Sequence, residues 1–230
     1  MSTEADQLGV ARDRLPALRR MVLLIGLPLA GGAGLVVHIL ADVSMPLAIV
    51  ALAALGATVW LGVLSTASPL GRRLVYRRVG IGAIAGLVGT FAYDAARYGT
   101  VALFSFSFKP FHVLTVFGEL FVGPRHPAAT IFLVGLLYHL SNGTFFGVAY
   151  TLVFRRPRWW TGALWGIVLE LCMATLYPSW LRMQQVGEFL QVSAIGHVVY
   201  GSVLGIVAGG LLASPGGGPD GPETPALAAQ

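Results

Sequence analysis

Four ionisable side chains lie inside long apolar segments of this chain: Asp94, His139, Glu170 and His197. Ionisable groups are costly in a bilayer, so they normally face the interior of a helix bundle and find partners there. Carboxylates and imidazoles can transfer protons, hold polar solutes or bind metal ions. The sequence therefore predicts a polar centre with one of these three chemistries.

The four groups fall at similar heights along their predicted helices. Counted from the outer end of each segment, Asp94 lies roughly 10 Å deep, Glu170 and His197 roughly 12 Å, and His139 roughly 15 Å. Helical spacing places further polar side chains on the same faces, namely Arg97, Asn142, Ser193 and Tyr200. This pattern predicts a polar chamber in the outer half of the membrane.

Two interpretations of this centre stay open. As a metal centre, its candidate ligands are His139, His197, Glu170 and Asp94, with haem iron as a further option for the two histidines. As a transport path or proton relay, it consists of Glu170, His139, His197, Asp94, Arg97, Asn142 and Tyr200. Asp94 and Arg97 stand three residues apart, which also permits simple mutual neutralisation. Glu170 has no cation within a turn on its own helix, so it must be protonated or partnered by another helix.

Composition and hydropathy predict the helices that position these residues. Of the 230 residues, 56% are hydrophobic and 11% are charged, whereas soluble domains average about 45–50% and 25%. A single cysteine excludes an internal disulfide. Apolar segments able to cross a core of about 30 Å occur at 21–41, 46–67, 79–101, 129–153, 160–178 and 189–213. The predicted fold is an all-α integral membrane protein, a bundle of six transmembrane helices over residues 21–213.

Arginines predict the orientation of this bundle. They cluster before the first segment, between the second and third, and between the fourth and fifth, while few cations flank the other ends. The positive-inside rule then places both termini in the cytoplasm, with a cytoplasmic segment at 1–20 and a disordered tail at 214–230. We expect a bacterial cytoplasmic membrane. The basic residues are spread over juxtamembrane segments, which excludes a nucleic-acid partner and leaves the lipid bilayer.

Two segments share an ungapped pattern. His139, Gly143, Gly147 and Pro157 have the same offsets as His197, Gly201, Gly205 and Pro215. Gly82 and Gly86 match Gly162 and Gly166 in the preceding segments. The pattern predicts a parallel repeat of helix hairpins, formed by spans three and four and by spans five and six. The extra residues between spans three and four predict a short interfacial helix near 110–122, as a lid or as a plain connector.

The paired glycines allow two interpretations. Small residues four apart let helix backbones approach closely, within one chain, in a homo-oligomer or against other membrane subunits. Glycines beside His139 and His197 would alternatively make room for a flat ligand such as haem.

Three functions remain open from these features. We place first the transport of a proton, a metal ion or a small polar solute. The alternatives are a haem- or metal-binding membrane protein and a non-catalytic assembly subunit of a membrane complex.

Overall fold

The computed structural model describes residues 22–214, and every element in that range is a helix. The helices are α2 (Gly26–Ala41), α3 (Met45–Ser65), α4 (Pro69–Phe104), α5 (His112–Val122), α6 (Ala128–Val153), α7 (Trp159–Trp180) and α8 (Val186–Ala213). Five of them, α3, α4, α6, α7 and α8, are long and apolar enough to cross a membrane. The prediction of an all-helical membrane bundle is confirmed for the described residues. The predicted segment 1–20 and all but the first residue of the predicted tail 214–230 lie outside the described residues.

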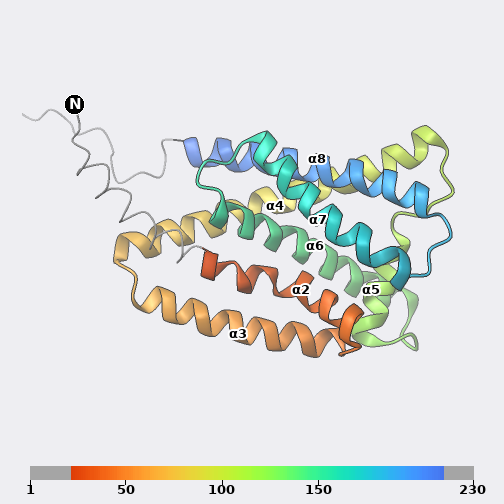
Figure 1. Cartoon of the computed structure of the whole chain (residues 1–230), viewed down its shortest axis with the longest axis horizontal. Coiled ribbons are helices and arrows are strands. Elements are labelled where there is room, and N and C mark those ends of the chain that lie inside the picture. Colours follow the sequence, from red (N-terminus) through yellow and green to blue (C-terminus); the bar gives the residue numbers. More distant parts are fainter. Residues whose placement is uncertain (1–21, 215–230) are drawn as a thin grey trace, which may run out of the picture.

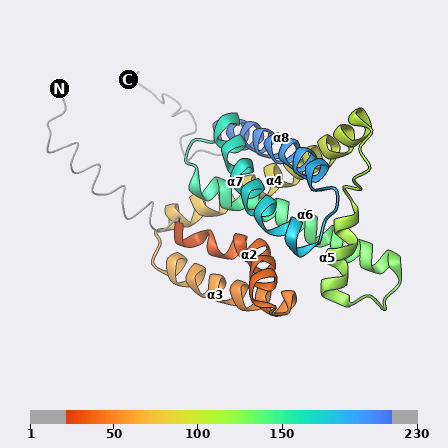
Figure 2. The same ribbon diagram turned by 45° about the vertical axis from the view of Figure 1, so that its right-hand side comes forward.

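The bundle has a core of four helices and a flanking pair. Helices α4, α6, α7 and α8 pack as neighbours in the pairs α4/α6, α4/α8 and α7/α8, while α2 and α3 pair beside them. Figure 1 shows α5 running across one end of the bundle, and Figure 2 shows α2 and α3 together on one side. The outer surface is apolar: Leu61 and Leu103 are 72% and 78% exposed. Such a surface is what lipid contact requires.

Helix α4 begins earlier than the predicted third span. Pro69 stands in its first turn, and the Ser68 hydroxyl accepts a hydrogen bond from the Gly71 backbone N–H at 3.1 Å, which is a favourable helix start. Its 36 residues extend over about 54 Å, longer than a hydrocarbon core. The arginines predicted to lie between spans two and three are therefore within the first turns of α4.

One of these arginines, Arg78, satisfies the end of α6. Its guanidinium donates to the backbone carbonyls of Thr151 at 2.5 Å, Phe154 at 3.1 Å and Arg155 at 3.1 Å. The last carbonyls of a helix have no partner within the helix, so an arginine from a neighbouring element stabilises them.

Helix α2 is shorter than the predicted first span. The chain turns at Ile25, and only the 16 residues Gly26–Ala41 form the continuous helix, so α2 is not among the five candidate spans. Pro28 explains the break, because proline lacks the N–H that would bond the Leu24 carbonyl and its ring crowds that carbonyl. The Trp60 indole N–H donates to the Leu24 carbonyl instead, at 2.6 Å.

We expect Trp60→Phe to lower the free energy of unfolding by about 1–3 kcal/mol, because it leaves a buried carbonyl without a donor. Leu24 is 1% exposed, so water cannot replace the indole. Unfolding in mixed micelles of increasing SDS fraction measures the loss. Trp159→Phe, at a position that is 61% exposed, is the matched control. Equal stabilities for the two variants would contradict this account of the break.

Helix α5 covers His112–Val122, within the range of the short helix predicted near 110–122. Its apolar side is buried through Leu114 and Phe117, while His112 and Glu119 are exposed. Gly118 contacts the backbone of Ile131, and Gly135 of α6 contacts the backbone of Leu114. This close backbone packing fixes α5 against α6.

Candidate functional site

Glycines bring the helices of two hairpins into backbone contact. In α4/α6, Gly82 meets the backbone of Gly147, and Gly86 meets that of Gly143. In α7/α8, Gly162 and Gly201 contact each other's backbone. Among the two predicted roles of these glycines, the contacts support close packing, because the opposing helix fills the space beside each one. Polar side chains on these helices are thereby within reach of one another.

The first polar pair joins α4 to α6. The His139 Nε2 atom lies 3.0 Å from Asp94 Oδ2 and 3.1 Å from Oδ1. The side chains of His139 and Asp94 are 14% and 18% exposed. Arg97 Nη1 lies 3.6 Å from Asp94 Oδ1. Asp94 therefore faces two partners, the Arg97 cation on its own helix and the His139 imidazole on α6.

The second polar pair joins α7 to α8. The His197 Nδ1 atom lies 2.8 Å from Glu170 Oε2 and 3.1 Å from the Ser193 carbonyl. The Ser193 hydroxyl donates to the Glu170 carboxylate at 2.6 and 2.7 Å. Glu170 thus finds its partners on another helix, which is one of the two outcomes expected from the absence of a cation in its own turn.

The hydrogen-bond partners assign the protons of both imidazoles. Carboxylate and carbonyl oxygens accept hydrogen bonds, so the nitrogen facing them carries the proton: Nε2 in His139 and Nδ1 in His197. The other nitrogen of each neutral ring then keeps a lone pair. Within residues 22–214, no hydrogen bond engages His139 Nδ1 or His197 Nε2. In its neutral form, each histidine therefore has one ring nitrogen that can accept a proton.

Tyr93 lies between the two pairs. Its ring centroid is 5.9 Å from that of His139 and 4.9 Å from that of His197. The Arg97 guanidinium carbon stands 4.8 Å from the same centroid. Sequence reasoning did not single out Tyr93, although it stands seven residues after Gly86 and four before Arg97 and so shares their helix face.

Arg97 is the most deeply buried cation at the site. It is 3% exposed, and its Nη2 atom donates to the Pro110 carbonyl at 2.5 Å. Its Nε atom is buried without a hydrogen-bond partner among the described residues. The contact with Pro110 ties the segment before α5 to the polar centre.

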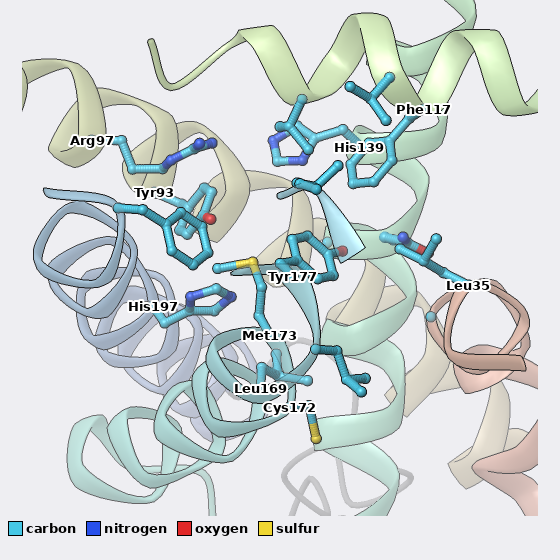
Figure 3. Close-up of a pocket in the computed structure, with 18 of the residues that line it drawn as sticks. Leu35, Tyr93, Arg97, Phe117, His139, Leu169, Cys172, Met173, Tyr177 and His197 are labelled. Atoms are coloured by element: carbon cyan, nitrogen blue, oxygen red, sulfur yellow. The ribbon is translucent and has the colours of Figure 1, made fainter. Parts of the chain in front are cut away.

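A cavity of about 970 Å³ opens in front of the two pairs. Tyr93, Arg97, His139 and His197 line it, whereas Asp94 and Glu170 do not. Figure 3 shows these four lining side chains gathered around the cavity, with Tyr177 and Met173 reaching in from α7. The carboxylates therefore stand behind the imidazoles, and the aromatic and cationic groups face the open space.

Two further predicted residues line the same cavity. Asn142 lies against Gly31 of α2. Tyr200 donates its hydroxyl hydrogen to the Gly143 carbonyl at 2.7 Å, which links α8 to α6. Both residues contribute to helix packing as well as to the cavity wall.

The four candidate metal ligands form two separate pairs. In the part of the chain that the structure describes, no three His, Cys, Asp or Glu side chains are grouped so that they could hold a metal ion. The Tyr93 ring contacts both imidazoles. The arrangement places a carboxylate beside each histidine and an aromatic ring between the histidines.

Comparison with known proteins assigns the chain to a family of unknown function. Neither a curated protein nor a solved structure matches the chain. A model for a family of unknown function, DUF6789, matches residues 76–216, more than half of the 230 residues. The matched region carries both His–carboxylate pairs and leaves out α2 and α3. The chain therefore belongs to the DUF6789 family.

Proposed function

We propose that this protein transports protons across a membrane through its two His–carboxylate pairs, coupled to a solute that occupies the cavity. The observation that carries the proposal is the convergence of Asp94–His139 and Glu170–His197, from four helices, on one cavity. Ionisable groups at such depth in a membrane protein typically mark a proton or ion pathway.

The chemistry of each pair suits proton transfer. A carboxylate on one ring nitrogen stabilises the imidazolium that forms when the other nitrogen accepts a proton. That accepting nitrogen belongs in both cases to a residue that lines the cavity. Polar side chains in the cavity wall, among them Arg97, His139 and His197, can hold water, and water there would connect the two acceptors.

A parallel repeat of the hairpins α4/α6 and α7/α8 is part of the proposal. Gly86 faces Gly143 in the first hairpin, whereas Gly166, its counterpart in the sequence match, faces the backbone of His197. The counterpart of Gly143 in the second hairpin is Gly201, and His197 precedes it by four residues. The packing of α7 against α8 is therefore displaced by one helical turn relative to the packing of α4 against α6.

The carboxylates shift by the same turn. Asp94 follows Gly86 by eight residues, while Glu170 follows Gly166 by four. The α7/α8 contact is displaced by one helical turn, and the carboxylate of α7 is displaced by one turn along its helix. The two displacements cancel, so each histidine still meets a carboxylate. Retention of the pair despite a changed register supports two copies of one functional unit.

We also propose six crossings with both termini in the cytoplasm, α2 and the turn before it forming the first crossing. The contact between Arg78 and the Arg155 carbonyl supports this orientation, because it brings two arginine-rich segments to the same end of the bundle. A one-sided cluster of arginines is what the positive-inside rule associates with the cytoplasmic face of a bacterial membrane.

Glu170→Gln tests proton transport directly. In vesicles that contain the protein and an internal pH dye, with a potential imposed by potassium and valinomycin, we expect proton influx to fall at least tenfold. Glutamine can still accept hydrogen bonds from Ser193 and His197, so the fold is expected to persist.

Glu119→Gln is the matched control, since Glu119 is exposed on α5 and does not line the cavity. It should leave the flux unchanged. Flux through the parent protein that equals the leak of protein-free vesicles, or equal fluxes for Glu170→Gln and the parent, would overturn the proposal.

A further inference from the structure

We propose that the solute in the cavity is an anionic amphiphile, a long apolar chain that ends in a carboxylate or a phosphate, and that it enters from the bilayer between α2 and α7. This inference rests on the proposed function, because it names the class of solute that the two pairs would serve.

The walls contributed by α2 and α7 suit an apolar chain. Leu29 and Val36 of α2 face the cavity together with Leu169 and Leu176 of α7. A volume of about 970 Å³ is at the upper end of ordinary ligand pockets, which span about 300–1,000 Å³. A long chain fits such a space better than a small polar solute does.

The same two helices leave a side opening. Ala33 of α2 and both Val168 and Cys172 of α7 line the cavity, and all three residues are exposed, so we infer that the cavity opens between these helices. Exposed apolar residues on this part of a membrane protein face lipid. A chain dissolved in the bilayer can therefore reach the cavity without passing through water.

The charged lining suits an anionic headgroup. Arg97, Lys109 and Arg182 line the cavity, and no Asp or Glu of the described residues does. His139 and His197 add groups that become cationic on protonation. Cationic and hydrogen-bond-donating groups at one end of an apolar cavity recognise a carboxylate or a phosphate.

Two buried donors beside the cavity have no hydrogen-bond partner among the described residues. Arg97 Nε and Trp165 Nε1 are the buried side-chain nitrogen or oxygen atoms of the described residues that have no hydrogen-bond partner, and both residues line the cavity. Buried polar groups in folded proteins are normally satisfied, so such atoms require an explanation. Both atoms are buried rather than exposed to the cavity, so a headgroup oxygen would reach Arg97 Nε only after the side chain reorients.

Quenching of Trp165 fluorescence tests the inference in vesicles that contain the full chain. The probes are 9,10-dibromostearate and its methyl ester, which share the chain and differ in charge. The signal is the quenching lost in Trp165→Phe, which removes the contribution of the other tryptophans. We expect saturable quenching by the acid and at least tenfold weaker apparent affinity for the ester. Competition by palmitate and by hexadecyl phosphate then shows which anionic headgroup binds more tightly, and stronger competition by either one supports the class.

Cys172→Phe and Leu171→Phe test the route. Cys172 lies at the side opening, whereas its neighbour Leu171 is 59% exposed and is not part of the cavity wall. We expect Cys172→Phe to slow the onset of quenching or weaken it at least tenfold, and Leu171→Phe to match the parent. Equal quenching by acid and ester, or no effect of Cys172→Phe, would overturn the inference. Saturable binding without proton flux would overturn only the transport proposal, and flux without binding would overturn only the amphiphile.

Discussion

Replacing Gly201 by valine is expected to separate α7 from α8 and to lower the free energy of unfolding by about 3 kcal/mol or more. A Cβ atom at this position would collide with the Gly162 backbone, and backbone cannot move aside as a flexible side chain can. Overpacking of ordinary cores costs about 1–3 kcal/mol and occasionally more. Unfolding in mixed micelles measures the loss.

The control for this substitution lies on the same helix. Gly210 is exposed near the end of α8, and a Cβ there would meet nothing within 4 Å. Gly210→Val introduces the same β-branched side chain without a collision, so it should cost less than about 1 kcal/mol. If the two variants have similar stabilities, the backbone contact does not hold the hairpin together.

The second large effect is expected for Arg97→Met, which should destabilise the protein by about 3–5 kcal/mol. Arg97 is 3% exposed, lies 3.6 Å from Asp94 and donates to the Pro110 carbonyl. Methionine fills a similar volume but leaves Asp94 with His139 as its remaining ionic partner among the described residues, and it leaves the carbonyl unpaired. The loss is therefore electrostatic rather than steric.

A double-mutant cycle separates these contributions. In Arg97→Met with Asp94→Asn, the uncompensated carboxylate is gone, so we expect recovery of at least about 1 kcal/mol relative to the sum of the single losses. The unpaired Pro110 carbonyl remains, which keeps the recovery incomplete. Additive losses would show that Arg97 and Asp94 do not stabilise each other.

Apolar runs were sufficient to predict most of the helices. The ranges 46–67, 129–153, 160–178 and 189–213 agree with α3, α6, α7 and α8 within a few residues, because lipid requires continuous apolar helices. The first span differed at Pro28, a helix breaker that the sequence itself contains. The start of α4 differed because hydropathy detects only the apolar part of a helix. It does not detect the arginine-rich first turns that begin at Pro69.

The need for partners at the polar centre also followed from the sequence alone. Asp94, Glu170, His139 and His197 lie within apolar segments, where an unpaired charge is too costly. Which residues pair was decided by tertiary structure. Asp94 has a local option in Arg97, yet it also meets His139, because the glycine contacts of α4 with α6 set the register of the two helices.

The cavity was determined only by the packing of separate elements. Its walls come from α2, α4, α5, α6, α7 and α8, and no periodicity within one helix encodes the gap that remains where six helices meet. Tyr93 shows the same division: its helix face is readable from spacing, but its place between two imidazoles depends on α6 and α8 together. The sequence determines which ionisable groups must face the bundle interior instead of lipid. The register between helices determines which of these groups pair, because register depends on contacts between residues far apart in the chain.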